Sequence, residues 1–225
     1  MTSEIQERHK KQLAVMRGFL EGGKFYLSAE ALELVRGTEN GTRKDGVTPK
    51  LHHQLSVARL ISTLLPHLLY PEETLAAAFL HDLLEDHGPQ WTQEKLSDRF
   101  GPRVAGAVWT LSKKTHGLVK TPEAYYEALA ECPIASLVKL SDRAHNIQTM
   151  HGVFSPEKQK LYVGELDTHY FPMIRIARRR YPQQYGAYEN LKILLRCQQA
   201  MVHRILEASG VRVAEEQLTL GALGT

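Results

Sequence analysis

Residues able to bind a metal ion stand at three separated places in the chain. They are His53, the run His81–Asp86 with the sequence HDLLED, and Asp142. Imidazole and carboxylate groups drawn from separate segments suit a divalent ion such as Mn, Fe or Mg, and they leave coordination positions open for water and phosphate. Together these residues predict a metal-dependent phosphohydrolase.

The HDLLED run falls at the end of a predicted helix. Its four polar residues are His81, Asp82, Glu85 and Asp86, and positions three and four apart share one face of a helix. We therefore expect all four side chains to converge around the helix end. Burying so many carboxylates and imidazoles together demands a cation.

A second polar stripe lies on the mostly apolar segment 134–150. His145, Asn146 and Thr149 follow Asp142 at three, four and seven residues, so all four share a helix face. An unpaired buried carboxylate is costly or becomes protonated, so Asp142 needs a metal or an arginine as its partner. Any one of these residues alone is more often an exposed cap or a satisfied core group, and only their joint occurrence indicates a site.

The composition excludes several classes of protein. With 225 residues and 43% hydrophobic content, the chain is expected to form one domain with a substantial core. The net charge is only +3, from 28 basic and 25 acidic residues, so we expect no nucleic-acid or membrane partner.

Cys132 and Cys197 are expected to be free core thiols in a reducing compartment. Residues 1–11 are too polar for a secretory signal and no stretch is long enough to span a bilayer, so we expect a cytoplasmic protein.

Apolar residues recur mostly at intervals of three and four, which predicts an all-α fold. We expect an N-terminal helix within residues 1–24, the main domain in residues 25–209 and a C-terminal tail in residues 210–225. The segments 37–49 and 113–120 are predicted to be loops. The predicted helices are 5–21, one that opens at Ser28, 51–69, 71–85, 92–100, 102–111, 122–130, 134–150, 156–180 and 185–209.

Four motifs follow one another in a defined order. They are Arg43-Lys44-Asp45-Gly46, the segment 49–53 followed by Val57-Ala58, AFLHDLLED at 78–86, and VKLSDRAHNIQTM at 138–150. In this combination the chain resembles the HD-domain hydrolases of the Rel/Spo type, which degrade the guanosine tetra- and pentaphosphate alarmones. The likeness covers roughly residues 25 to 180 and is far more specific than a His-Asp pair alone. It implies an all-helical HD-domain phosphohydrolase fold.

The resemblance implies a set of ligands for one Mn(II) ion. His52 competes with His53 for one ligand position, but the distance to Val57-Ala58 matches the family when His53 is the ligand. The implied ligands are His53, His81, Asp82 and Asp142.

The resemblance also implies catalytic and substrate-binding roles. Glu85 and Asp86 would orient and deprotonate the attacking water and assist proton transfer to the leaving group, whereas the alternative for this pair is a solvated helix end. Arg43 and Lys44 would frame the nucleotide and its phosphates, and their alternative is an ordinary polar turn.

Residues on the Asp142 helix receive different roles from the same resemblance. Asn146 and Thr149 match positions that contact the nucleotide, whereas Arg143 and His145 are expected to support the helix through ion pairs or hydrogen bonds. The segment 113–117 is equally well explained as a source of phosphate contacts or as a surface loop.

The implied reaction is hydrolysis of the 3′-pyrophosphate of ppGpp or pppGpp, giving GDP or GTP and pyrophosphate. One alternative is an HD phosphohydrolase that acts on ppApp, NADPH, a dNTP or a cyclic nucleotide. The other is a non-enzymatic nucleotide-binding module, which would have no physical reason to keep the extra negative charge of Glu85 and Asp86 beside a metal site.

Two departures from the family pattern leave the base preference open. Gln148 stands where many members carry an arginine, and the loop 43–53 is one residue longer than the common spacing. The length of the chain leaves no room for an alarmone synthetase domain, so we expect a stand-alone small alarmone hydrolase whose partner is a small-molecule nucleotide. Whether it forms an oligomer is left open.

Overall fold

The computed structural model describes residues 2–115 and 117–209, and helices account for nearly all of the regular structure in them. The predicted all-α class is confirmed, whereas the predicted tail 210–225 lies outside the described residues. The first half contains α1 (Thr2–Gly22), α2 (Tyr26–Thr38), α3 (Leu51–Ser62), the 3₁₀ turn η1 (Leu65–His67), α4 (Pro71–Leu80), α5 (Leu83–Asp86) and α6 (Gln93–Leu111). The second half contains β1 (Lys114–Thr115), β2 (Leu118–Val119), α7 (Pro122–Ala130), α8 (Pro133–Thr149), α9 (Pro156–Glu165), the π-helical turn η2 (Leu166–Tyr170), α10 (Phe171–Arg180), the 3₁₀ turn η3 (Pro182–Gln184) and α11 (Tyr185–Ala208).

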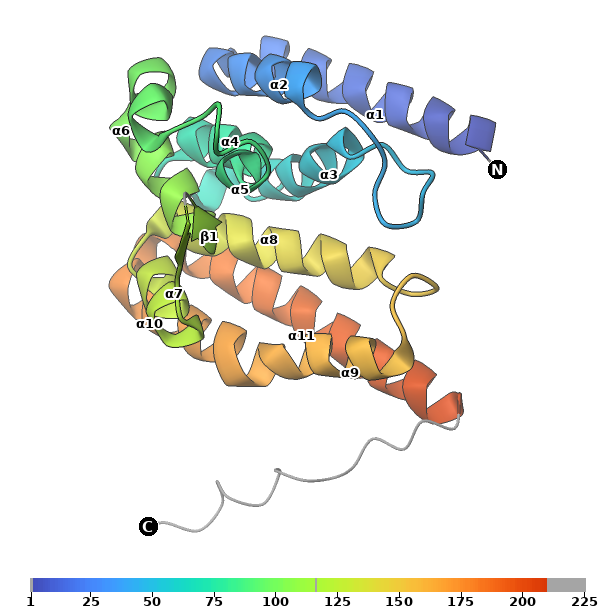
Figure 1. Ribbon diagram of the computed structural model, residues 1–225. Coiled ribbons are helices and arrows are strands. Elements are labelled where there is room, and N and C mark those ends of the chain that lie inside the picture. Colours follow the sequence, from blue (N-terminus) through green and yellow to red (C-terminus); the bar gives the residue numbers. More distant parts are fainter. Residues whose placement is uncertain (1, 116, 210–225) are drawn as a thin grey trace.

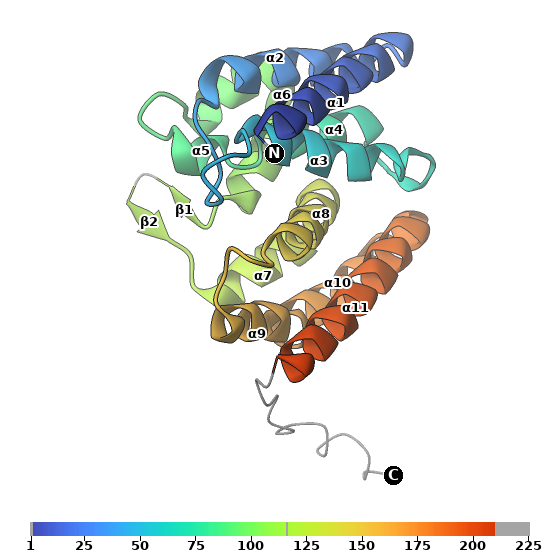
Figure 2. The same ribbon diagram turned by 90° about the vertical axis from the view of Figure 1, so that its right-hand side faces the viewer.

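Helix α8 runs through the middle of the molecule. It packs against α3, α4 and α6 on one side and against α7, α9, α10 and α11 on the other. Figures 1 and 2 show α1 to α6 gathered on one side of α8 and the later helices on the other. Polar side chains on α8 therefore meet groups from both halves of the chain.

Several helix starts follow directly from local sequence. Helices α7, α8 and α9 each begin with a proline, whose missing N–H costs nothing in the first turn. The side chains of Thr121, Cys132 and Ser155 precede these prolines and accept a hydrogen bond from a backbone N–H of the first turn. These caps fix where α8 starts and hence which of its residues face the centre of the molecule.

The core extends through the whole described chain. Every residue of α4 from Thr74 to Leu80 is buried, and its small residues Ala76, Ala77 and Ala78 let α2 and α3 pack closely against it. Helix α1 contributes Met16 and Leu20 to the same core. No helix among the described residues is long and apolar enough to cross a membrane.

The predicted helix 51–69 is too long at its C-terminal end. Helix α3 ends at Ser62, and a 3₁₀ turn follows at Leu65–His67. Pro66 lies in this turn and cannot donate the hydrogen bond that an α-helix would require there.

The predicted helix 71–85 is also wrong, because the structure divides it at His81 and Asp82. Helix α4 ends at Leu80, and the four-residue helix α5 starts at Leu83. The imidazole Nδ1 of His81 lies 2.9 Å from the Ala78 carbonyl oxygen, and the Asp82 carbonyl accepts from the Asp86 N–H. The break thus occurs at the two residues of this segment that were predicted to bind metal.

Two other expectations about helices have mixed outcomes. The predicted break between helices 92–100 and 102–111 occurs within α6 at Gly101, whose φ of 82° is accessible to glycine but not to most residues. The predicted helix 156–180 is interrupted by the π-helical turn η2. Pro172 explains this interruption, because it has no N–H for the carbonyl of Thr168 one α-helical turn earlier.

The predicted loop 113–120 contains a minimal sheet. Lys114 pairs with Val119 and Thr115 with Leu118 in antiparallel register.

The prediction that both cysteines are core thiols is wrong for one of them, since Cys197 is exposed on α11 and only Cys132 is partly buried. An exposed position on α11 is compatible with a small residue of any polarity.

Candidate active site

Four side chains from three helical regions meet beside α8. His53 Nε2 lies 3.1 Å from His81 Nε2 and 3.0 Å from an oxygen of Asp142. His81 Nε2 lies 3.0 Å from an oxygen of Asp82. His53, His81 and Asp142 are buried, whereas 35% of the Asp82 side chain is exposed. These are the four residues named as metal ligands from the sequence.

The spacing of these donor atoms fits one small divalent ion. Ligands about 2.1 Å from an ion and at right angles to one another lie about 3 Å apart. The ligand atoms of His53, His81 and Asp82 all lie within 4.8 Å of one another, and Asp142 lies 3.0 Å from His53 and 3.9 Å from His81. Two imidazoles and two carboxylates suit Mn or Fe better than Mg, which the sequence also allowed but which prefers oxygen ligands alone.

Contacts of the Nδ1 atoms, which face away from the cluster, hold both imidazoles in the orientation that a metal requires. The Nδ1 atom of His81 lies within hydrogen-bond distance of the Ala78 carbonyl oxygen, so it carries the proton and leaves Nε2 free to bind. His53 Nδ1 lies 2.8 Å from His145 Nδ1. His145 therefore supports a predicted ligand on α3, whereas the sequence led us to expect that it supports its own helix.

Asp142 is fixed from both sides by its own helix. Lys139 Nζ donates to one carboxylate oxygen at 2.8 Å, and Asn146 Nδ2 donates to the other at 2.5 Å. The sequence indicated a metal or an arginine as the partner of this carboxylate, but lysine supplies the countercharge one helical turn before it. Arg143 instead donates to Glu165 and to the Tyr162 carbonyl.

The buried charges change the protonation of the cluster. Burial lowers the pKa of His53 and outweighs the opposing effect of Asp142. Burial also disfavours a charged His81, but the Asp82 and Asp142 carboxylates outweigh it and raise the pKa of His81 to about 9. Burial opposes ionisation of Asp82, yet the neighbouring His81 lowers the pKa of Asp82 to about 2. Without a metal, a proton on His81 thus compensates the carboxylates.

His145 is kept neutral by its surroundings. Burial and the nearby His53 and Arg43 lower the pKa of His145 to about 3. A neutral imidazole can exchange one hydrogen bond with His53 without adding positive charge beside the ligands.

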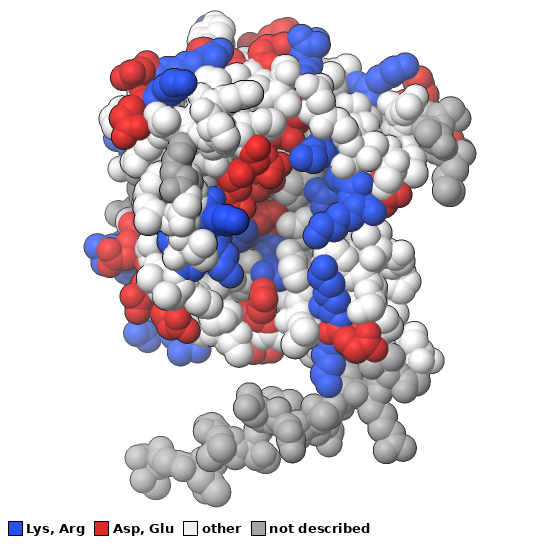
Figure 3. All heavy atoms as spheres, viewed as in Figure 1, with Lys and Arg blue, Asp and Glu red and all other residues white. Residues whose placement is uncertain are grey.

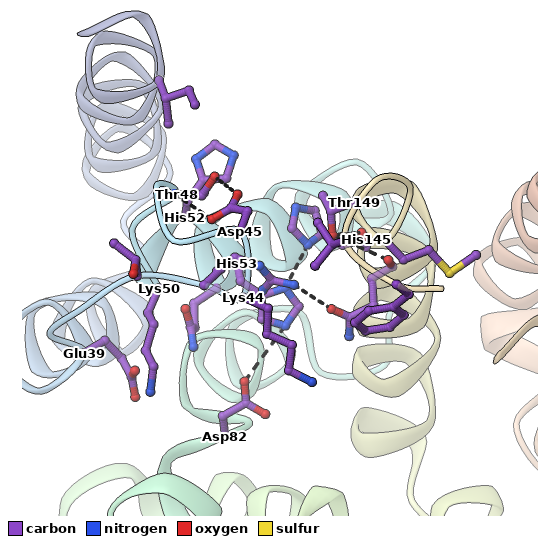
Figure 4. A pocket seen from close by; sticks show the side chains of 18 of the residues that line it. Glu39, Lys44, Asp45, Thr48, Lys50, His52, His53, Asp82, His145 and Thr149 are labelled. Atoms are coloured by element: carbon purple, nitrogen blue, oxygen red, sulfur yellow. Dashed lines mark hydrogen bonds and ion pairs between the residues drawn. The ribbon is translucent and has the colours of Figure 1, made fainter. Parts of the chain in front are cut away.

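A cavity of about 590 Å³ opens directly over the cluster. His53 and Asp82 lie at its base, with His145 on the far side of His53, and the loop that carries Lys44 and Asp45 lies across the opening (Figure 4). A volume of this size falls in the range of small-ligand sites. We call this cavity the cleft.

The loop between α2 and α3 is ordered by its own hydrogen bonds. The Asp45 carboxylate accepts hydrogen bonds from the backbone N–H groups of Val47 and Thr48. The backbone N–H of Arg43 donates to the Thr48 carbonyl. Gly46 has a φ of 72°, which the tight turn requires and glycine adopts at little cost. The turn carries the two cations predicted to bind substrate.

Both predicted cations line the cleft. Arg43 donates to the side-chain oxygen of Asn146 at 2.8 Å, so a hydrogen-bonded chain leads from this loop through Asn146 to Asp142. The Lys44 ammonium lies 5.2 Å from the centre of the Phe154 ring. Arg43 is therefore tied to the cluster, whereas Lys44 extends across the opening.

The predicted acidic pair separates in the structure. Asp86 lines the cleft and pairs with Lys50 at 3.3 Å. The Glu85 carboxylate instead accepts hydrogen bonds from the backbone N–H groups of Lys113 and Lys114 at the start of the β1–β2 hairpin. The sequence led us to expect both carboxylates at one point, and the hairpin that holds Glu85 away from it was not predicted.

Thr149 and Asn146, which the resemblance places in contact with the nucleotide, also line the cleft. The sequence did not single out several other lining residues, because nothing in their types or spacing distinguishes them from surface positions. Buried Glu39 is one of them; its carboxylate lies 3.0 Å from His87, and burial raises its pKa. The others include Lys50, Phe154, Lys158 and Tyr162.

Charge is divided across this face of the molecule. Acidic side chains gather in the centre of the hollow, and basic side chains flank them on both sides (Figure 3). Carboxylates at the centre suit a cation, and cations around it suit the phosphates of an anionic ligand. The cleft thus combines a metal site with a surrounding for phosphate groups.

Comparison with known proteins identifies the class to which this fold and site belong. The family model of the HD domain matches residues 31–179, which is most of the chain. The matched region contains all four predicted ligands and the acidic pair. The chain belongs to the HD domain family.

Curated relatives within this class share a large part of the chain. A guanosine-3′,5′-bis(diphosphate) 3′-pyrophosphohydrolase of Aquifex aeolicus is 39% identical over 136 residues, which cover 58% of this chain and 18% of the relative. A protein of the same name in Haemophilus influenzae is 32% identical over 148 residues, covering 62% and 21%. A probable GTP pyrophosphokinase of Mycobacterium leprae is 29% identical over 153 residues, covering 65% and 19%. The chain spans about a fifth of the length of these relatives.

Proposed function

We propose that this protein hydrolyses the 3′-pyrophosphate of guanosine alarmones, converting ppGpp to GDP and pppGpp to GTP with release of pyrophosphate. The proposed cofactor is one Mn(II) ion held by His53, His81, Asp82 and Asp142. The names of the two pyrophosphohydrolase relatives support this substrate class. The proposed place of action is the cytoplasm.

One observation carries the proposal. The four donor atoms converge at the base of a cleft whose rim carries Arg43, Lys44 and Lys158. A metal site alone fits many hydrolases, but a metal site surrounded by cations fits a substrate with several phosphates. A pyrophosphate group carries enough negative charge to bind the metal ion and the surrounding cations at the same time.

The proposed chemistry breaks the bond between the ribose 3′ oxygen and phosphorus. A bound divalent ion would lower the pKa of a water molecule and neutralise phosphate charge. Asp86, which lines the cleft beside Asp82, is positioned to accept the proton of the attacking water. The ribose 3′ oxygen takes up a proton, and the oxygen of water leaves in the pyrophosphate.

The other side chains bind and orient the substrate. Arg43 and Lys44 would hold the phosphates of the substrate on the side opposite the carboxylates. Asn146 connects Arg43 to Asp142 by hydrogen bonds, so substrate bound to Arg43 is held in register with a metal ligand. Glu85, whose carboxylate accepts hydrogen bonds from the hairpin backbone, would act indirectly by holding α5 against the hairpin.

The test is a hydrolysis assay with Mn(II), with and without chelator. Products from ppGpp are identified by chromatography and by phosphorus NMR. We expect chelator-sensitive formation of GDP and pyrophosphate in equal amounts. Formation of inorganic phosphate instead, or turnover that does not respond to chelator, would contradict the proposal.

The same assay includes ppApp, NADPH, dNTPs and cyclic nucleotides, because one observation keeps the base preference open. Gln148, which stands where many family members carry an arginine, does not line the cleft. Cleavage of another nucleotide but not of ppGpp would retain the metal site and replace the substrate. Binding without cleavage of any of them would identify a nucleotide-binding module.

A further inference from the structure

A second cavity of about 920 Å³ lies next to the cleft. It is enclosed by α1, α3, α8 and α11, and Figure 2 shows α8 and α11 beneath α1 and α3 on this side of the molecule. We call this second cavity the groove. The proposed reaction uses none of the residues that line only the groove.

The groove differs from the cleft in its charge. Arg8, Lys11 and Arg59 line it, and no aspartate or glutamate of residues 4–115 or 117–209 does so. Among the residues that the structure describes, none of these three cations forms an ion pair. A cavity with cations and no carboxylates attracts an anion and offers no ligands to a metal ion.

Some residues that line the groove carry buried polar atoms without a partner in the described part of the chain. Gln198 is only 9% exposed; its side-chain nitrogen donates to the Ala144 carbonyl, but its oxygen is buried and unpartnered. Gln12 donates to Ser56 and likewise leaves its oxygen unpartnered, and His52 Nδ1 has no partner. Buried polar groups are almost always hydrogen-bonded, and these three atoms expose almost no surface, so their side chains can bind a polar molecule in the groove once they rotate toward it.

Part of the wall of the groove is apolar. Val15 is 58% exposed and Met201 is 52% exposed, and Leu60 and Leu194 lie beside them. Cations on one side and apolar side chains on the other match a molecule that joins phosphates to a flat base. Amide oxygens such as that of Gln198 can accept hydrogen bonds from the amino or imino groups of a base.

From these observations we infer that the groove is a second binding site for a phosphorylated nucleotide, separate from the site of hydrolysis. Lys11 and Arg59 bind its phosphates, and Gln12 and Gln198 rotate to bind its polar groups. Arg8, His52, His145 and Thr149 line both cavities, so the bound nucleotide contacts the wall of the cleft without entering it. This inference holds whichever nucleotide the cleft hydrolyses.

The test is calorimetric titration of the metal-loaded protein with GDP, which carries both a base and phosphates but has no 3′-pyrophosphate to lose. Two variants separate the sites. Arg43→Ala with Lys44→Ala weakens the cleft, and Lys11→Glu with Arg59→Glu weakens the groove. The matched control is Lys10→Glu with Arg204→Glu, which makes the same change of net charge at exposed positions outside both cavities.

We expect the wild type and the control to bind GDP at two sites. The groove variant should lose one site, with its dissociation constant raised at least about tenfold, because reversing two cations removes charge-assisted hydrogen bonds to phosphate. The cleft variant should keep that site. Identical titrations of the groove variant and the control would overturn the inference, as would a single wild-type site that disappears in the cleft variant.

Two further ligands test the chemical class. Tripolyphosphate carries the phosphates without a base, and guanosine carries the base without phosphates. We expect both to bind the groove more weakly than GDP, and equal binding of tripolyphosphate would exclude a nucleotide. Hydrolysis of ppGpp by the groove variant is measured in parallel, so that failure of the groove proposal and failure of the proposed reaction give different results.

Discussion

The side chains in the two walls of the cleft are fixed by very different numbers of contacts. The inner wall is the ligand cluster at the base of the cleft, His53, His81, Asp82 and Asp142, of which His53 and Asp82 line the cavity itself. These residues lie on or beside packed helices. Each of the three buried ligands contacts a further group of the chain: His145, the Ala78 carbonyl, or Lys139 and Asn146. Such contacts fix the position of a ligand before any ion arrives.

The outer wall is formed by side chains with fewer constraints. Lys44 and Lys158 are exposed, and both ammonium groups lie near the Phe154 ring. Arg43 is the exception, because its hydrogen bond to Asn146 ties it to the inner wall. The difference teaches that the position of the metal chemistry is fixed by the core, whereas the recognition of phosphate is left to long side chains that can adapt to the ligand.

The sharpest test of the inner wall removes a ligand. We expect His81→Ala and Asp82→Ala each to abolish both stoichiometric metal binding and turnover, an effect beyond the roughly 100-fold loss typical of outer partners. Metal content by atomic emission and hydrolysis of ppGpp are the measurements. A full metal complement in both variants would refute the ligand assignment, and thermal melting serves as the check that each variant is folded.

Changing the acidic pair separates chemistry from metal binding. We expect Asp86→Asn to lower kcat by about 10²- to 10⁴-fold with the metal retained, since loss of a general base has effects of this size. Glu85→Gln should have the smaller effect of the two, because its carboxylate binds the hairpin backbone rather than lining the cleft. An equal loss in both variants would show that Glu85 turns into the cleft during the reaction.

The outer partner of His53 supplies a test of intermediate size. We expect His145→Ala to weaken metal binding by about 10- to 100-fold, because His53 loses the group that fixes its ring. A chelator competition titration measures this. Gln148→Ala, on the same helix but outside the cleft, is the control and should bind metal as the wild type does; a similar loss in both would point to a general disturbance of α8.

Protons compete with the metal for His81. The pKa of His81 is raised to about 9 in the absence of metal, whereas a metal ligand must be neutral. Below pH 9 the ion therefore has to displace a proton, and metal affinity should rise about tenfold for each pH unit up to that value. Competition titrations from pH 6 to pH 9 measure the slope, and an affinity independent of pH would show that His81 is neutral or is not a ligand.

The outer wall should show the smallest effect. We expect Lys44→Ala to raise KM by about tenfold and to change kcat little, because a flexible, exposed cation contributes one charge-assisted contact that the ground state and the transition state share. Steady-state kinetics with ppGpp measure both constants. A loss confined to kcat would show that Lys44 stabilises the transition state rather than binding the substrate. The outer wall would then take part in the chemistry, as the inner wall does.

The sequence by itself determined the helical class and the chemical types in the site. Apolar spacing and proline-led caps marked most helices, since both signals act over a few residues. The HDLLED run, His53 and Asp142 indicated a metal site, because few other arrangements of buried carboxylates and imidazoles are stable. The helical class and the presence of a metal site required only local rules and the known preferences of metal ions, whereas the choice of His53 over His52 came from the resemblance to a known family.

Only the tertiary structure decided how the site is held and what surrounds it. The break at His81 and Asp82, the pairing of Lys139 with Asp142 and the capture of Glu85 by the hairpin all depend on side-chain orientations and on contacts between packed elements. The groove depends on α1, α3, α8 and α11 meeting in space. Long-range packing sets such contacts, and helical periodicity carries no information about which helices become neighbours.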